Sequence, residues 1–375
     1  MRRFVHAKRL ALKRRLSLAL TGDFDPYPDI PEGMCFSPSQ RNAAVAANLL
    51  PDLDWPAHGQ GDVRAWQKKA RQKWRDLLCL SGEPAALSVL DERDMPISGD
   101  YARRRVYVRF AEGCDAPVDI IRATASGKSG GHPPVIICMQ GTNAGAHLNL
   151  GEVRMPADVY KVANGSALAL QAADNGFIAV SFERACFGER SERHLVKPSG
   201  SPTVDAAFHA LALSQTLLGQ TVAELDALRR WIGSEVAPGA QVYLAGYSAA
   251  GTAAIAAAAA ITEFAGIAAG GCVGFVRETL LARGTNGYND IPGMLRWFEF
   301  DGQMALIAPR PCVVVAGESD HIWPHAGAEK VIASARSAWQ EMDAGDRLRL
   351  ERAGGGHTYY PELMWPALRD AMTAS

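Results

Sequence analysis

Short apolar runs alternate with longer amphipathic segments from about residue 86 onward. The runs at 135–139 and 177–182 are continuously apolar, as strands buried on both faces require. Two earlier runs, 103–110 and 117–123, favour an antiparallel pair of strands. Strands that alternate with helices predict an α/β fold with a mostly parallel central sheet and helices on both faces. The other predicted strands are 241–245, 266–275, 311–316 and 348–351, and the predicted helices are 157–173, 204–233, 249–260, 327–342 and 361–372.

The first 85 residues have a different pattern. Two segments that combine apolar and basic residues, near 3–20 and 62–80, favour helices, and the chain between them is interrupted by Pro26, Pro28, Pro31 and Pro38. This part of the chain shows no strand–helix alternation. We therefore expect a helical N-terminal extension over 1–85 and a catalytic domain over 86–375.

The overall charge excludes some classes of partner. The chain has 375 residues, 48% of them hydrophobic, with 39 basic and 40 acidic residues and a net charge of −1. Such a balance gives no general attraction for nucleic acid. Seven basic residues fall within the first fifteen; they could form a helix that touches a membrane or a partner, but we favour a solvated helix face because few leucines accompany them. Nothing approaches the roughly 18 consecutive apolar residues of a membrane span.

The seven cysteines show no paired spacing, and several lie in apolar, strand-like runs. Buried thiols pack there as small hydrophobic groups, so neither a disulfide framework nor a zinc site is expected. No other cluster has the ligand spacing of a metal site, and no organic cofactor is implied. The prediction is a cytoplasmic protein without a cofactor, and its oligomeric state stays open.

A nucleophile motif stands between a predicted strand and a predicted helix. Ser248 lies in Gly246-Tyr247-Ser248-Ala249-Ala250-Gly251, directly after the strand 241–245. A serine on a strained strand-to-helix turn needs small residues two positions before and after it, and Gly246 and Ala250 are small. An ordinary turn serine is the plainer alternative. The context favours a nucleophile.

A base and an orienting acid are expected further along the chain. Asp320 and Glu318 both follow the strand 311–316, and we choose Asp320 because it lies further into the loop, with Glu318 as the alternative acid. A capping role for Asp320 in the next helix is the competing interpretation. We expect His357 to be the base. It follows the last strand after three glycines, which can bend the loop toward the sheet edge.

The oxyanion of a tetrahedral intermediate needs backbone donors. We expect the N–H of Ala249, next to the nucleophile, and the N–H of Thr142, in the loop after the strand 135–139. An ordinary glycine-rich turn at Thr142 is the alternative.

Other residues near the strand ends could line a substrate pocket. Arg184 and Glu189 could recognise an anionic group, although a structural salt bridge is the favoured interpretation. The insertion at about 277–308 contributes Trp297, which fits an apolar acyl wall and a core position equally well. The full set of these candidates is Gln140, His147, Arg184, Glu189, Tyr247, Trp297 and His321.

Several motifs also carry a resemblance to a known family: Gln140-Gly141-Thr142, Phe182 to Arg190, Gly246 to Gly251, Ile291 to Met294, and Ile307 to Pro311 continuing to Asp320. Together they resemble the α/β-hydrolase superfamily, and more narrowly its dienelactone-hydrolase-related and acetyl-xylan-esterase-like branch. The resemblance covers about residues 100–372 and implies the triad Ser248, Asp320 and His357. Gln140-Gly141 stands where relatives often have His-Gly, and Ala250-Gly251 where they have Gly-Gly, which leaves the substrate open.

These observations favour one function over two others. The main hypothesis is a serine carboxylesterase that cleaves a small-molecule ester through an acyl-enzyme. The same triad could instead cleave an amide or peptide, or transfer the acyl group to an acceptor other than water. A non-catalytic binding protein on a hydrolase fold is the third hypothesis, and the complete set of triad residues argues against it.

Overall fold

The computed structural model describes residues 2–22, 31–59, 61–80, 86–124, 133–142, 145–283 and 287–374. The chain divides into two compact units, Met1–Val45 and Ala46–Ser375. The helices are α1 Arg2–Thr21, α2 Pro38–Ala47, α3 Trp55–His58, α4 Val63–Leu77, α5 Asp158–Ala163, α6 Leu168–Asp174, α7 Pro202–Ala212, α8 Leu217–Trp231, α9 Ala249–Ala260, α10 Leu280–Arg283, α11 Phe300–Ala305, α12 His325–Gln340 and α13 Pro361–Thr373.

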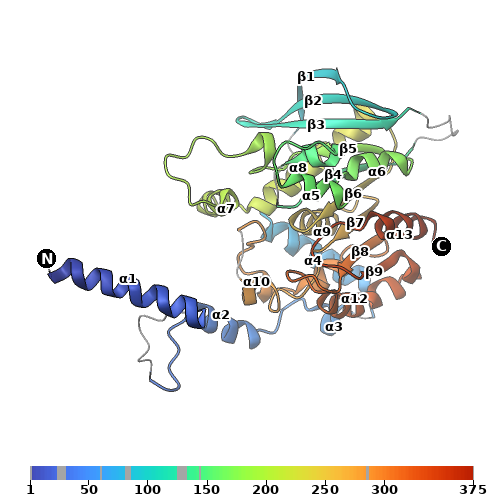
Figure 1. Cartoon of the computed structure of the whole chain (residues 1–375). Helices are drawn as coiled ribbons and strands as arrows, with labels where there is room; N and C mark the ends of the chain where they lie inside the picture. Colours follow the sequence, from blue (N-terminus) through green and yellow to red (C-terminus); the bar gives the residue numbers. More distant parts are fainter. Residues whose placement is uncertain are drawn as a thin grey trace. The chain divides into compact units, whose positions relative to one another are not determined.

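One sheet runs through the second unit (Figure 1). Over the described part of the chain it has nine strands in the order β1-β2-β3-β5-β4-β6-β7-β8-β9. The first strands pair antiparallel, up to the pairing of β3 with β5, and all the other pairs are parallel. This arrangement confirms the predicted mostly parallel sheet. The strands are β1 Ser88–Met95, β2 Tyr101–Ala111, β3 Cys114–Ala123, β4 Val135–Met139, β5 Ile178–Phe182, β6 Val242–Tyr247, β7 Gly266–Gly270, β8 Cys312–Gly317 and β9 Leu348–Ala353.

Hydrophobic layers cover both faces of the sheet. Successive residues of β4 point to opposite sides, so Ile136 and Cys138 join a core with α6 and α13, whereas Val135 and Ile137 join the larger core with α4, α8, α9, α11 and α12. The parallel strands β4 to β8 are buried along their whole length. This two-sided burial is the reason that these strands are continuously apolar in the sequence.

Two predicted helices are interrupted in the structure. The predicted helix 157–173 is divided into α5 and α6, with Gly165 between them at a φ of +84°. The predicted helix 204–233 is divided into α7 and α8, with Ser214 between them at a φ of +57°. An α-helix has no place for a residue of positive φ, so each segment ends before that residue. Strand β1 was not predicted, because most of its residues are exposed and carry no apolar signal.

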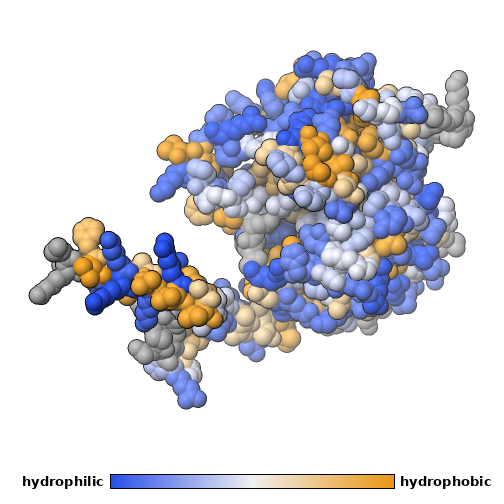
Figure 2. Space-filling view, in the orientation of Figure 1, coloured by the Kyte–Doolittle hydropathy of each residue, from blue (hydrophilic) through white to orange (hydrophobic). Residues whose placement is uncertain are grey.

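The division between the two units lies earlier than the predicted boundary near residue 85. Helix α4 belongs to the second unit, where Trp74 is fully buried and its indole N–H donates to the carbonyl of Ala256 on α9, at 3.1 Å. In the first unit, the large apolar side chains of α1 are exposed and interspersed with basic ones, as Figure 2 shows along this helix. None of the described helices is long and apolar enough to cross a membrane.

Candidate active site

Ser248 lies on a sharp turn between β6 and α9. Its backbone has a φ of 55° and a ψ of −126°, a strained conformation for a residue with a side chain. Its N–H donates to the carbonyl of Gly270 on β7 at 2.7 Å, which ties the turn to the neighbouring strand. A Cβ atom on Gly246 would lie 2.5 Å from the carbonyl oxygen of Ala250, so the turn closes only with glycine at that position. The sequence feature that predicts a nucleophile turn therefore has a steric origin.

His357 and Asp320 meet above the end of β8. Nδ1 of His357 lies 2.7 Å from Oδ2 of Asp320, whose side chain is buried. The other carboxylate oxygen accepts hydrogen bonds from the N–H groups of Ile322 and Trp323, at 2.8 and 2.9 Å. Burial disfavours the charged form of Asp320, but these hydrogen bonds outweigh it and hold the pKa of the carboxyl below its ordinary value. The structure thus sets a carboxyl group of lowered pKa against the imidazole of His357.

The alternative acid, Glu318, lies elsewhere. Its carboxylate is partly exposed and pairs with the guanidinium of Arg352 on β9. The glycines before His357 bring the two loops together: the carbonyl of Gly355 accepts from the N–H of Ser319 at 3.0 Å, and a Cβ on Gly317 would lie 2.6 Å from that carbonyl oxygen. The close approach of these loops brings Asp320, and not Glu318, to the histidine.

Ser248 and His357 line the same cleft, which has a volume of about 260 Å³. In the described part of the chain no hydrogen bond joins the two side chains, and catalytic hydrogen bonds often tighten only when substrate binds. The ring centroid of Tyr247 lies 5.0 Å from that of His357 and 4.6 Å from that of Tyr359. The residues that line the cleft are Gly141, Thr142, Tyr160, Lys161, Asn164, Tyr247, Ser248, His357, Thr358 and Tyr359.

The predicted oxyanion donors flank Ser248. Ala249 is the first residue of α9, where a helix presents backbone N–H groups without partners inside the helix. Thr142 lines the cleft, and a Cβ on the preceding Gly141 would lie 3.2 Å from the Cβ of Ser248 and 2.8 Å from the carbonyl oxygen of Tyr247. The loop after β4 therefore lies directly against the serine turn.

Gln140 and Arg184 support this loop from beneath and do not line the cleft. The Gln140 amide donates to Oδ1 of Asn149 at 2.6 Å and to the carbonyl of Ser166 at 2.8 Å, and its oxygen accepts from the hydroxyl of Tyr359. The Arg184 guanidinium donates to the carbonyl of Gln140 at 2.7 and 3.0 Å and to that of Gly141 at 3.0 Å. Arg184 is only 1% exposed and its hydrogen bonds go to backbone carbonyls, so this candidate pocket residue lies behind the lining of the described cleft.

A buried carboxylate, Glu183, also holds the loop, and the sequence analysis missed it. Both of its oxygens accept from the N–H of Ala146, at 3.0 and 2.9 Å, where the 3₁₀ helix η1 (Ala146–Leu150) begins. Burial raises the pKa of Glu183 to about 7, against the effect of its hydrogen bonds from Ala146 and Glu189. Glu183 stands within the motif 182–190, but nothing in that motif singles it out, since the N–H group of Ala146 that it binds comes from another loop.

Three further pocket candidates lie outside the cleft. His147 is buried, with Nε2 2.9 Å from Oδ2 of Asp158. Trp297 lies under the ammonium of Lys73, 4.1 Å from the ring centroid, and belongs to the periphery of the core. His321 is exposed, and its ring centroid is 6.2 Å from that of His357, so it borders the site without lining it. Of the seven candidate substrate-binding residues, Tyr247 alone lines the described cleft.

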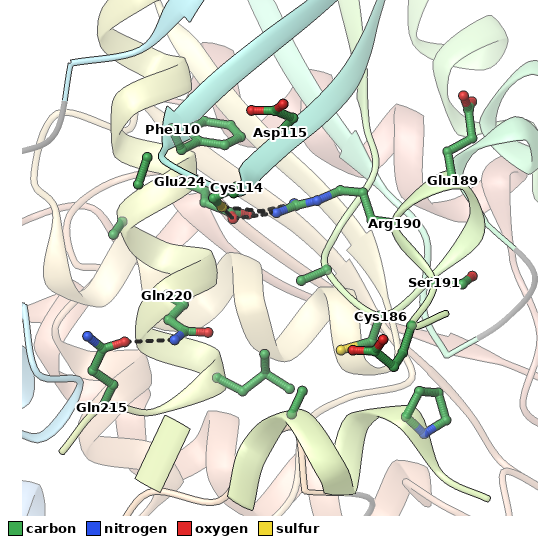
Figure 3. Close-up of a pocket in the computed structure, with 18 of the residues that line it drawn as sticks. Phe110, Cys114, Asp115, Cys186, Glu189, Arg190, Ser191, Gln215, Gln220 and Glu224 are labelled. Carbon is green, nitrogen blue, oxygen red and sulfur yellow. Dashed lines mark hydrogen bonds and ion pairs between the residues drawn. The ribbon is translucent and has the colours of Figure 1, made fainter. Parts of the chain in front are cut away.

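Glu189 lies at a second and larger cleft of about 730 Å³ (Figure 3). Its carboxylate pairs with Arg105 at 2.9 Å, which agrees with the structural salt bridge favoured above. In the same cleft Arg190 and Glu224 face each other in an ion pair of 2.7 Å. None of the residues that line the Ser248 cleft lines this one.

Helix α5 and the residue after it contribute three cleft residues that the sequence analysis did not identify: Tyr160, Lys161 and Asn164. They lie within what was predicted as one long helix, and no local signal in the sequence marks them as cleft residues. Across the described residues, no three His, Cys, Asp or Glu side chains are grouped as a metal site would require.

Comparisons with known proteins identify the fold. No family model matches the sequence, and no curated protein matches it. A candidate acetyl xylan esterase from Bacteroides fragilis matches the structure with a TM-score of 0.68 and 17% sequence identity, over 87% of this chain and 84% of its own. A glucuronoyl esterase from Solibacter usitatus matches with a TM-score of 0.58 and 16% identity, over 87% and 98% of the two chains. A glucuronoyl esterase from Teredinibacter turnerae matches with a TM-score of 0.58 and 14% identity, over 96% and 98%. The chain has the α/β-hydrolase fold, as its sequence motifs predict.

Proposed function

We propose that this protein is a serine hydrolase that cleaves a carboxylic ester through an acyl-enzyme intermediate. Ser248 is the nucleophile, His357 the general base and acid, and Asp320 the residue that orients the imidazole. The observation that carries the proposal is the 2.7 Å contact between His357 and the buried Asp320, in the cleft that a strained serine also lines. The esterases of similar fold support an ester substrate, although a shared fold alone does not determine the reaction.

The first half-reaction transfers the acyl group to the protein. Oγ of Ser248 attacks the ester carbonyl carbon while Nε2 of His357 takes the hydroxyl proton. The negative charge moves to the carbonyl oxygen, where the N–H groups of Ala249 and Thr142 stabilise it. Asp320 stabilises the imidazolium through Nδ1–H, which is the reason that an ionised carboxylate at this position is useful. The intermediate collapses when His357 gives its proton to the leaving alcohol oxygen and the C–O bond breaks.

The second half-reaction hydrolyses the acyl-enzyme and regenerates the free hydroxyl of Ser248. A water molecule gives a proton to His357 and attacks the acyl-enzyme carbonyl, again with its oxygen between the two N–H groups. Collapse of this second intermediate releases the carboxylic acid and returns the proton to Ser248. The same residues thus serve both steps, and no further chemical group is required.

Turnover of 4-nitrophenyl acetate by the purified chain and by Ser248→Ala tests this function. We expect the variant to lose at least about 10³-fold in kcat, because a residual rate would come only from the oxyanion donors and binding. Ser234→Ala is a matched control, since Ser234 is exposed and lines neither cleft described above. Equal rates for the wild type and Ser248→Ala, or failure of a fluorophosphonate probe to label Ser248, would refute the proposal.

A further inference from the structure

The Ser248 cleft has an unbalanced charge. Among the described residues that line it, Lys161 has the only permanently charged side chain, and none is an aspartate or a glutamate. The chain as a whole carries a net charge of −1, so the positive charge in the cleft is not a consequence of a generally basic surface. A cleft walled by low-dielectric groups concentrates the effect of such a charge on a ligand.

Lys161 has no counter-ion among the described residues. It takes part in no ion pair or hydrogen bond of its side chain, whereas another lysine of the same unit, Lys330, pairs with Glu278 at 3.0 Å. The acid that acts on it electrostatically is Asp158, on the same helix. Asp158 is fully buried, and one of its oxygens already accepts from His147 at 2.9 Å and from the N–H groups of Arg154 and Met155 at 3.1 and 2.7 Å. Asp158 therefore holds the start of α5 in place instead of pairing with the ammonium.

This position is unfavourable for Lys161 in the absence of a ligand. The side chain is partly buried, and burial lowers the pKa of its ammonium, with Asp158 opposing the effect. An ammonium that loses water without gaining a partner raises the free energy of the empty site. An anion bound in the cleft would supply the missing partner.

The other lining residues indicate the size and kind of ligand. The cleft volume of about 260 Å³ is smaller than that of a typical pocket for a drug-sized molecule, so the bound part of the substrate is small. The rings of Tyr247 and Tyr359, 4.6 Å apart, form an apolar wall beside the serine. One monovalent cation next to an apolar wall matches a single carboxylate attached to a short carbon skeleton.

We propose that the substrate carries a carboxylate in addition to its scissile ester, and that Lys161 binds this carboxylate while Ser248 attacks the ester. The proposal rests on the ester hydrolysis described above and specifies its substrate class. Lys161 acts here as a binding residue that selects an anionic ester over a neutral one of the same shape.

The test compares charged and neutral esters of matched shape. In the first pair the carboxylate lies in the leaving group: 4-acetoxybenzoate is charged and 4-acetoxybenzamide is its neutral partner. In the second pair it lies in the acyl group: 4-nitrophenyl hydrogen adipate is charged and 4-nitrophenyl methyl adipate is neutral. We expect Lys161→Met to lower kcat/KM for the charged member of at least one pair by about tenfold, with less than a twofold change for its neutral partner. Lys161→Arg should restore most of the preference. Lys68→Met removes an exposed lysine of α4 outside the cleft and should change neither ratio.

A direct binding measurement separates this proposal from the proposed reaction. Calorimetric titration with 4-acetamidobenzoate, which has no ester, should show at least about tenfold weaker binding to Lys161→Met than to the wild type. The carboxylate proposal is overturned if Lys161→Met changes the charged-to-neutral ratio of kcat/KM by less than twofold for both pairs and binds 4-acetamidobenzoate as well as the wild type does. This holds even if Ser248 hydrolyses neutral esters. Lys161-dependent binding without any Ser248-dependent turnover overturns the reaction but leaves the anion site standing.

Discussion

Arg184 offers a sharp test of how the loop after β4, which carries the proposed oxyanion donor Thr142, is held in place. Its guanidinium makes three hydrogen bonds of 2.7 to 3.0 Å to the carbonyls of Gln140 and Gly141, directly before Thr142. The charged group lies 4.4 Å from the ring centroid of Tyr288. No ion pair joins it to a carboxylate among the described residues, and all three of its hydrogen bonds go to backbone carbonyls.

We predict that Arg184→Met lowers both stability and kcat. The substitution takes a charged donor away from two buried carbonyls, at about 1–3 kcal/mol each, and removing a buried charge without a counter-ion offsets part of this cost. The net loss of unfolding free energy should be about 2–4 kcal/mol. If the loop shifts and the Thr142 N–H no longer faces the oxyanion, kcat should fall by about 10²-fold, the effect of losing one oxyanion donor. KM should change little, because Arg184 does not line the cleft.

Arg310 provides the matched control. This arginine also donates only to backbone carbonyls, including those of Ala258 at 2.6 Å and Phe264 at 2.9 Å. It precedes the first residue of β8, so it lies at the amino ends of the parallel strands, whereas Ser248 follows the carboxyl end of β6. Arg310→Met should lose a similar amount of stability in urea unfolding while kcat on 4-nitrophenyl acetate stays within about threefold of wild type. A kcat that falls equally in both variants, or in neither, would refute the role assigned to Arg184.

Four further substitutions test other parts of the site. Asp320→Asn should lower kcat on 4-nitrophenyl acetate by about 10³–10⁴-fold, because the amide no longer stabilises an imidazolium, whereas Glu318→Gln should change it less than twofold; the reverse order would make Glu318 the acid. Glu183 has a pKa of about 7 when folded against an ordinary 4.5, so the folded state holds its proton more tightly and the wild type should lose up to about 3 kcal/mol of stability as the pH rises from 4.5 to 7. Glu183→Gln should abolish that loss in urea unfolding at pH 5 and 7.5, and an unchanged slope would contradict the assignment. Gly246→Ala should lower the Tm and the fluorophosphonate labelling together, since its Cβ would lie 2.5 Å from the Ala250 oxygen, and a wild-type Tm would show that the turn can relax.

Much of the fold could be predicted because its signals are local. A strand buried on both faces needs a continuous apolar run, and a helix against the sheet needs an apolar stripe, so β4, β6 and α9 can each be recognised from their own residues. The serine turn is local too, since Gly246 and Ala250 are close to Ser248 in the chain. The breaks at Gly165 and Ser214 could not be predicted in the same way, because a positive φ leaves little trace in hydrophobic periodicity.

The division between the two compact units differs from the predicted boundary near residue 85 for another reason. Helix α4 has the polar, basic composition of a surface helix, but Trp74 on one face of it reaches across to α9 and is fully buried. Composition averages over all faces of a helix. Which face is covered depends on a partner about 180 residues further along the chain.

The sequence by itself determined the strands of the parallel part of the sheet, the serine turn and the loop that carries the histidine, because each of these depends on residues that are neighbours in the chain. Only the tertiary structure brought Asp320, and not Glu318, into contact with His357, set Arg184 and Glu183 against the loop that follows β4, and brought Lys161 into the cleft. Those outcomes depend on contacts between loops far apart in sequence, whose geometry follows from the packing of the whole sheet. A side chain a few residues from a strand end can point into the cleft, beneath it or into solvent, and the one-dimensional pattern is the same in all three cases.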